Sequence, residues 1–184
     1  SSRRRHTKFR NVTGVQTCAL PIWDKDAANT YQANHSHAPY GDITKINEKD
    51  IPDHDVLLAG FPCQPFSSGG AKLGFDDVRG TLFFDIVRIL KEKQPSAFIL
   101  ENVRNLKSHD KGRTFSVIMH HLQSLGYFVH YEILNSAHLT PQNRKRIFFV
   151  GFKKDVNFYF PSPSNELKPL NSILDTIVEI GRAH

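Results

Sequence analysis

Asp55-Val56-Leu57-Leu58-Ala59-Gly60-Phe61-Pro62-Cys63-Gln64-Pro65 joins a short apolar run to a cysteine that stands between two prolines. The apolar run predicts a buried strand, and open α/β sheets place ligands and chemistry at the carboxyl ends of such strands. Pro62 and Pro65 fix φ and remove two backbone donors, so the loop is stiff and aims one side chain. Cys63 is therefore either a small buried hydrophobe in a turn or a nucleophile that a partner activates.

A second apolar run, Ala97-Phe98-Ile99-Leu100-Glu101-Asn102-Val103, ends in a carboxylate. Glu101 at this position can be a helix N-terminal group, a salt-bridge partner or an acid in a pocket. Burial would raise the pKa of such an acid, so that it could hold and deliver a proton near neutral pH.

A third segment, Gln142-Asn143-Arg144-Lys145-Arg146, precedes the apolar run Ile147-Phe148-Phe149-Val150-Gly151-Phe152. Strand periodicity predicts that Gln142, Arg144 and Arg146 share one face. An exposed basic strand is the simpler alternative for this segment when it is taken alone.

Strands alternate with helices along the chain, which is the pattern of a parallel α/β sheet. Gly126 is expected to end the last helix as its C′ residue, and residues 161–164 mark the exit from the unit. The expected strands are residues 55–61, 96–103, 128–134 and 147–152, and the expected helices are residues 24–35, 81–93 and 113–125.

Together and in this order, Pro62-Cys63-Gln64, Glu101-Asn102-Val103 and Gln142-x-Arg144-x-Arg146 resemble motifs of the DNA cytosine-5 methyltransferases of bacterial restriction–modification systems. Gly41-Asp42-Ile43-Thr44 and Gly74 to Phe84 resemble further segments of that family. The resemblance runs from about Trp23 to Phe152. It implies a truncated Rossmann-like methyltransferase fold that depends on S-adenosylmethionine, with a mostly parallel sheet flanked by helices.

The resemblance also implies catalytic roles. Cys63 would attack C6 of a cytosine flipped out of duplex DNA, and Glu101 would bond N3 and the exocyclic amine. Arg144 would hold the base O2, and Arg146 would orient Cys63 or its loop.

The same resemblance assigns contacts to the cofactor and to DNA. The S-adenosylmethionine contacts fall on Trp23, Asp42, Ile43, Pro62 and Leu82. The DNA contacts fall on Gln64, Ser67, Arg79 and Gln142, in part within a glycine-containing loop suited to closing over DNA. For Asp42, a turn-forming role is an equal alternative. The histidines have no ligand-like spacing, so no metal site is expected.

Residues 1–22 and 179–184 resemble translated sequencing adapters. Ala19-Leu20-Pro21-Ile22 can be encoded by a string whose reverse complement, shifted by one nucleotide, encodes Ile180-Gly181-Arg182-Ala183. We therefore expect two non-native tails that contribute nothing to the native fold.

The net charge of the chain depends on whether these tails are counted. The formal net charge is +6 for the whole chain, but residues 23–178 hold 18 cations and 17 carboxylates, so their net charge is +1. The high isoelectric point is therefore no argument for nucleic-acid binding.

Residues 23–160 are expected to form a partial catalytic domain, and residues 161–178 to begin the connection to a target recognition region. As an interior slice, the chain alone is expected to be inactive.

Cys63 is the sole cysteine outside the expected tails, which argues for a reducing, cytoplasmic setting without disulfides. No apolar run is long enough for a membrane span.

The expected partners are duplex DNA and a cognate restriction endonuclease, and the enzyme is expected to be a monomer. The alternatives are a tRNA cytosine-5 methyltransferase, a thiol hydrolase or phosphatase, or a fragment without activity. A phosphatase loop would need an arginine at Gly69.

Overall fold

The computed structural model describes residue 22 and residues 24–35, 38–63, 82–162 and 169. Its strands are β1 (Val56–Gly60), β2 (Ala97–Val103), β3 (Phe128–Asn135) and β4 (Lys145–Phe152). Its α-helices are α1 (Lys25–His35), α2 (Leu82–Lys93) and α3 (Arg113–Ser124). Every predicted element is confirmed, and each end lies within two residues of the prediction.

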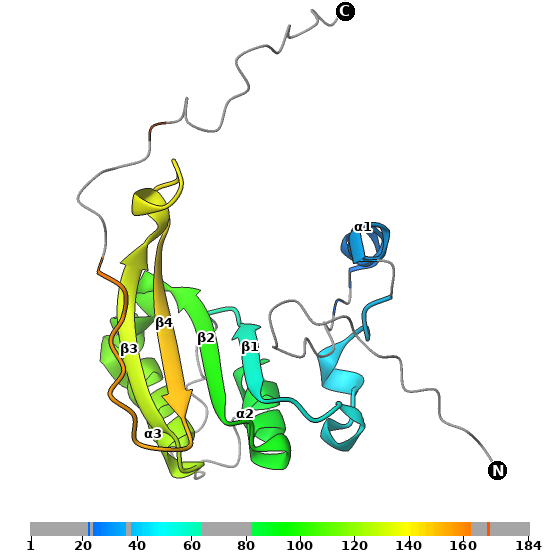
Figure 1. Ribbon diagram of the computed structural model, residues 1–184, viewed down its shortest axis with the longest axis horizontal. Coiled ribbons are helices and arrows are strands. Elements are labelled where there is room, and N and C mark those ends of the chain that lie inside the picture. The colour runs from blue at the N-terminus through cyan, green and yellow to red at the C-terminus, as the bar shows by residue number, and fades with distance from the viewer. Residues whose placement is uncertain (1–21, 23, 36–37, 64–81, 163–168, 170–184) are drawn as a thin grey trace, which may run out of the picture.

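The strands form one sheet in the order β1-β2-β4-β3 (Figure 1). β1 and β2 are parallel and are joined through α2, while β4 runs antiparallel to both β2 and β3. The expected α/β fold with flanking helices is confirmed: β1, β2 and β3 run in one direction, as expected for a mostly parallel sheet, and β4 runs against them. The link from β3 to β4 holds only the short turn η7 (Ser136–His138), whereas a parallel crossover needs a dozen residues or more.

The core lies on one face of the sheet, beneath α2 and α3. Phe98 and Leu100 of β2 and Phe149 of β4 point to this face and are fully buried. The two helices cover them with residues spaced three or four apart, the period of a helix face. The buried helix residues are Phe83, Ile86, Ile89 and Leu90 in α2 and Thr114, Ile118 and Leu122 in α3.

The turn after α3 closes this core. Gly126 has φ of 82°, which confirms its expected place as the helix-ending residue. Tyr127 then enters the core, where its hydroxyl donates to the Pro95 carbonyl at 2.8 Å and its ring packs against Phe98. Burial raises the pKa of Tyr127 to about 12, so its hydroxyl stays a donor at neutral pH.

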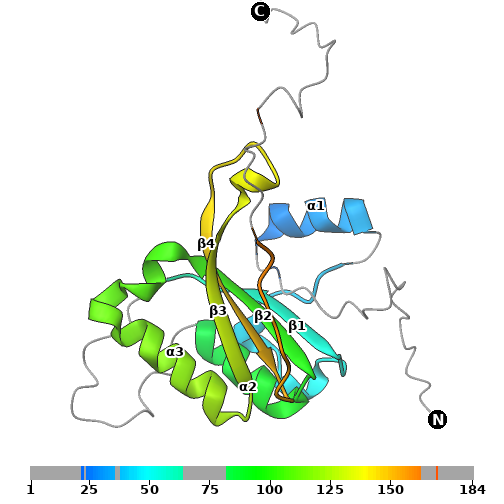
Figure 2. The ribbon, with the colours of Figure 1, turned by 60° about the vertical axis from the view of Figure 1, so that its left-hand side comes forward.

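Residues 153–162 cross the opposite face of the sheet as an extended segment, on the side away from α3 (Figure 2). Its Phe158 ring lies 5.5 Å from the His130 ring and 5.3 Å from the Phe152 ring, between centroids. Farther along this face Leu58 is 65% exposed. None of the described helices is long and apolar enough to cross a membrane.

The expected tails, apart from Ile22, and most of the expected connection at residues 161–178 lie outside the described residues. Those domain boundaries therefore stay predictions.

The close pairing of β2 and β4 makes one glycine a sensitive site for mutation. A Cβ at Gly151 would overlap the fully buried Phe98 ring on the neighbouring strand. We expect Gly151→Ala to lower the free energy of unfolding by about 1–3 kcal/mol, because a close-packed core absorbs extra volume poorly. The measurement is urea denaturation. Gly60→Ala is the matched control, since its nearest contact would be an ordinary 3.5 Å to Glu101 Oε2; equal losses in both variants would contradict the packing argument.

Candidate active site

Cys63 lies just past the end of β1, in a segment anchored by the residue two positions before it. Phe61 is buried, with its ring 5.3 Å from the Phe83 ring, and Pro62 is exposed. Cys63 is half-buried against the core, and this burial raises the pKa of its thiol above the ordinary value. Within the part of the chain that the structure describes, no hydrogen bond or ion pair reaches the thiol. The protonated thiol is therefore the favoured form here, and attack would require its activation.

Asn102 fixes this segment to the neighbouring strand. It is 1% exposed, and its Nδ2 donates to the Phe61 carbonyl at 2.9 Å. Its Oδ1 accepts from the Val103 N–H at 2.7 Å. A buried amide must be satisfied in this way, so Asn102 holds the Cys63 segment beside the end of β2.

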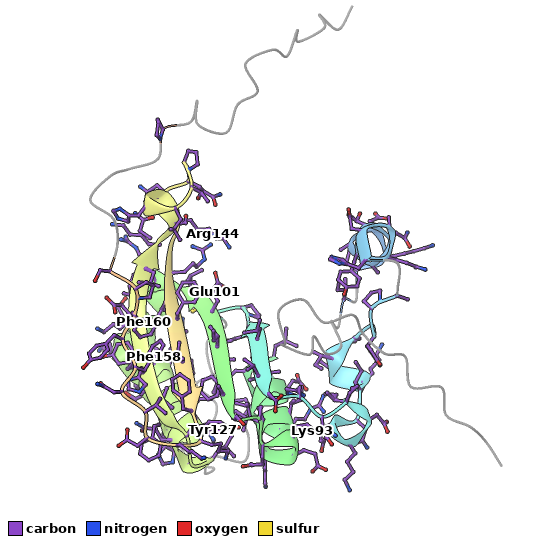
Figure 3. The ribbon with its side chains drawn as sticks, viewed as in Figure 1. Lys93, Glu101, Tyr127, Arg144, Phe158 and Phe160 are labelled. Atoms are coloured by element: carbon purple, nitrogen blue, oxygen red, sulfur yellow. The ribbon has the colours of Figure 1, made fainter. Side chains whose placement is uncertain are left out.

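Glu101 points to the other face of β2 and is held by two arginines. Arg146 Nε lies 2.8 Å from Glu101 Oε1, and Arg144 Nη2 lies 3.7 Å from the same oxygen. Because β4 is antiparallel to β2, its amino-terminal end lies beside the carboxyl end of β2, where Glu101 and Arg144 meet (Figure 3). Of the three alternatives for Glu101, the structure shows the salt-bridge partner, with a side chain 34% exposed.

The two carboxylate oxygens of Glu101 differ in their surroundings. Oε1 takes both arginine contacts, whereas Oε2 faces Gly60, which pairs with Glu101 across the parallel ladder. Gly60 lies three residues before Cys63. Oε2 has no polar partner among the described residues, so it is the oxygen available to a ligand beside the Cys63 segment.

The expectation that Gln142, Arg144 and Arg146 share a strand face is wrong, because β4 begins only at Lys145. Gln142 lies in the β3–β4 connection, where its carbonyl accepts from the Ser136 hydroxyl at 2.6 Å. All three nevertheless border one polar groove of about 550 Å³. Its lining residues are Val103, Arg104, Asn105, Gln142, Asn143, Arg144, Lys145 and Arg146.

Asp42 begins the short helix η1 (Ile43–Lys45) and has the turn-forming role that the sequence left open. Its Oδ1 accepts from the Thr44 hydroxyl at 2.8 Å and from the Thr44 N–H at 3.0 Å. These two bonds hold the pKa of Asp42 below its ordinary value, and the bond from the Thr44 hydroxyl has the larger effect. Among the described residues, Lys45 Nζ lies near Oδ2, at 3.6 Å, and this ionised oxygen can still accept from a ligand amine.

Leu82 is the first residue of α2 and is half-buried against the core. The described part of the chain holds no cluster of three or more metal-ligating side chains. The predicted contacts Trp23, Gln64, Ser67 and Arg79 lie outside the described residues, so their places stay predictions.

Sequence reasoning gave no role to Asn102, Arg104, Lys145 or Arg88. A polar residue inside an apolar strand such as β2 signals a buried partner, which could have indicated Asn102. Arg88 bonds residues 40 and 45 positions away in sequence, and no local pattern shows such contacts.

The family model of the C-5 cytosine-specific DNA methylases matches residues 6–183. The chain therefore belongs to the C-5 cytosine-specific DNA methylase family, and the resemblance found in the sequence is confirmed.

Two relatives are methyltransferases of restriction–modification type. The chain is 55% identical over 177 residues to the Type II methyltransferase M1.ScrFI of Lactococcus lactis subsp. cremoris, covering 93% of this chain and 46% of the relative. It is 54% identical over 154 residues to the Type II methyltransferase M.NgoBI of Neisseria gonorrhoeae, and this match covers 83% of this chain and 49% of the relative. The chain thus spans about half the length of these relatives.

Solved structures share the fold. The crystal structure of the S. pombe Dnmt2 methyltransferase aligns with a TM-score of 0.66 at 19% identity, covering 88% of this chain and 54% of that one. The Spodoptera frugiperda DNMT2 mutant structure aligns with a TM-score of 0.63 at 19% identity, and the alignment covers 88% of this chain and 53% of that one. The truncated Rossmann-like methyltransferase fold is confirmed by this likeness.

The bond from Asn102 to the Phe61 carbonyl predicts that Asn102 controls the exposure of Cys63. In Asn102→Ala the buried carbonyl loses its donor, which should cost about 1–3 kcal/mol of stability and loosen the Cys63 segment. We expect iodoacetamide to alkylate Cys63 several-fold faster in this variant, measured by mass spectrometry in a Cys18→Ser background. Asn105→Ala is the control, because its exposed side chain makes no described bond. If both variants alkylate at the wild-type rate, Asn102 does not hold the segment.

Proposed function

We propose that the full-length enzyme transfers a methyl group from S-adenosylmethionine to C5 of a flipped cytosine in duplex DNA. One observation carries the proposal: the Glu101 carboxylate, fixed by Arg146, lies at the sheet edge where β1 leads into Cys63. A nucleophile and a carboxyl group at one edge suit a reaction that adds to a base and balances its charge.

In the first step the Cys63 thiol loses its proton to water, and the thiolate sulfur bonds to C6 of cytosine. The C5–C6 double bond opens, and its electron pair makes C5 nucleophilic. Glu101 Oε2 faces the base N3, and a proton shared with N3 withdraws the charge that the attack adds to the ring. Arg146 holds Oε1 at 2.8 Å, which leaves Oε2 directed at the base.

S-adenosylmethionine, when bound, supplies an electrophilic methyl group for C5. The residues present suit the cofactor: Oδ2 of Asp42, which also lies near Lys45, can accept from the adenine amine, and Ile43, Pro62 and Leu82 offer apolar contacts. Arg144, half exposed beside Glu101, suits the base O2. In the last step C5 loses its proton to water and N3 returns its proton to Glu101. The C6–sulfur bond breaks with its electrons returning to Cys63, and the C5–C6 double bond reforms.

The polar groove supports DNA as the substrate. Its lining includes Arg104, Arg144, Lys145 and Arg146, and no carboxylate. Arg146 and Arg144 contact Glu101, while Arg104 and Lys145 have no acidic partner among the described residues. Two uncompensated cations next to the base site are placed to bind the phosphates on either side of a flipped nucleotide.

The family match and the Type II relatives favour DNA over tRNA. We also infer that the enzyme is a monomer. We infer a restriction endonuclease of the same system as well, because the relatives are Type II methyltransferases.

The activity can be tested by methyl transfer. We expect the full-length enzyme to move tritiated methyl from S-adenosylmethionine to mixed-sequence duplex DNA, with 5-methylcytosine as the product. Cys63→Ser should lower the rate at least a thousandfold, and Glu101→Gln about a hundred- to ten-thousandfold, the range for one proton-transfer group. Methylation of tRNA in place of DNA, or an active Cys63→Ser enzyme, would overturn the proposal.

The groove predicts a change in the salt dependence of DNA binding. Arg104→Gln with Lys145→Gln removes two phosphate contacts, so the slope of log affinity against log salt should fall in magnitude by about 2. The loss should be the same for every DNA sequence, as titrated by fluorescence anisotropy. Lys91→Gln with Lys154→Gln removes the same charge at the other end of the sheet, where the slope should stay unchanged. Equal slopes in the two double variants would place the DNA elsewhere.

A further inference from the structure

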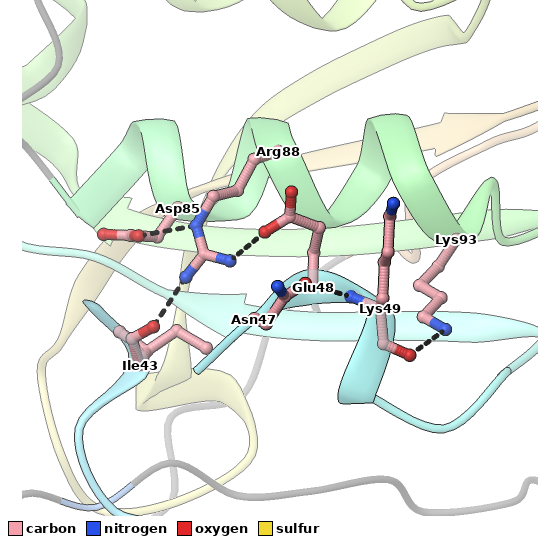
Figure 4. Close-up of polar contacts among 7 residues, drawn as sticks. All are labelled: Ile43, Asn47, Glu48, Lys49, Asp85, Arg88 and Lys93. Carbon is pink, nitrogen blue, oxygen red and sulfur yellow. Dashed lines mark hydrogen bonds and ion pairs between the residues drawn. The ribbon is translucent and has the colours of Figure 1, made fainter. Parts of the chain in front are cut away.

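Arg88 on α2 makes three directed contacts through one guanidinium group (Figure 4). Its Nη2 donates to the Ile43 carbonyl at 2.6 Å, and its Nη1 to Glu48 Oε2 at 2.7 Å. Its Nε donates to Asp85 Oδ1 at 2.9 Å, one turn away on the same helix. The side chain is 27% exposed. The rigid fork thus joins α2 to two separate short helices, η1 and η2 (Glu48–Asp50).

Each contact has a distinct effect. Asp85 orients the guanidinium from within α2, because residues three apart on a helix are neighbours. Glu48 adds a charge-assisted bond to η2, stronger than a neutral one. Ile43 accepts through its backbone carbonyl, so Arg88 fixes the main chain of η1 whatever the side chain there.

We infer that Arg88 is a positioning residue for S-adenosylmethionine. The inference rests on the proposed function, in which Asp42 and Ile43 hold the adenine and Leu82 lies toward the methionyl end. Leu82 and Arg88 are six residues apart on one helix, a rise of about 9 Å at 1.5 Å per residue. By bonding the Ile43 carbonyl, Arg88 makes α2 set the separation between the two ends of the cofactor site.

A purely structural role would act differently, and Lys93 offers the comparison. Lys93 Nζ lies 3.2 Å from the Lys49 carbonyl and 3.2 Å from Asp53 Oδ1. It therefore joins the same helix to η2 and the residues after it, without touching η1. If these contacts only hold the fold together, the loss of either cation should have the same consequences.

The test uses the full-length enzyme and measures binding rather than turnover. We expect Arg88→Gln to weaken S-adenosylhomocysteine about tenfold by calorimetry, which is the order of one lost charge-assisted bond. DNA affinity should stay within twofold, and kcat at saturating cofactor should also stay within twofold. Arg88→Lys keeps the charge but not the planar guanidinium fork, so it should bind S-adenosylhomocysteine nearly as weakly as Arg88→Gln. Glu48→Gln keeps a neutral hydrogen bond to Arg88 and should lower the affinity for S-adenosylhomocysteine about threefold.

Lys93→Gln is the control and should bind S-adenosylhomocysteine like the wild type, with any effect confined to the melting temperature. Equal cofactor affinity in the Arg88→Gln, Glu48→Gln and Lys93→Gln variants, or a matching loss in DNA affinity, would overturn the inference. If Arg88→Gln does not fold, Arg88→Lys and Glu48→Gln decide the same question. A wild-type enzyme that binds no S-adenosylhomocysteine would instead contradict the proposed function, so the two failures are distinguishable.

Discussion

The parallel pairing of β1 with β2 is the constraint on which the site depends. Its register places Gly60, the last residue of β1, opposite Glu101, two residues before the end of β2. The buried Asn102 then extends the pairing past the last residue of β1 by binding the Phe61 carbonyl. A slip of one residue would turn Glu101 to the core face and separate it from Arg146. Hydrophobic burial on the helix-covered face therefore fixes the position of Glu101 on the other face.

The antiparallel strand β4 contributes what a parallel strand could not. Because β4 starts where β2 ends, Arg146, the second residue of β4, reaches Glu101. Arg144, just before the strand, is half exposed and lies at the rim of the same edge. The sheet thus brings a carboxylate, two guanidinium groups and a thiol-bearing segment to one edge, although they lie up to 83 positions apart in the sequence.

Local patterns in the sequence predicted the elements well, because apolar periodicity and the glycine at Gly126 act over a few residues. The direction of β4 was missed, since it depends on a connection too short for a crossover. The grouping of Glu101 with Arg144 was expected only from three strand-end motifs taken together. The Arg88 contacts and the free Oε2 of Glu101 could not be predicted, because both depend on side-chain geometry between distant segments.

The most direct measurement is covalent capture on duplex DNA that carries 5-fluorocytosine, with the full-length enzyme and S-adenosylmethionine present. Fluorine at C5 cannot leave as a cation, so a Cys63–C6 bond would persist after methylation. We predict a stable covalent adduct, and proteolytic digestion should locate the modified base on the peptide that contains Cys63. An enzyme that binds DNA and cofactor but forms no adduct, or forms it on another residue, would contradict this account.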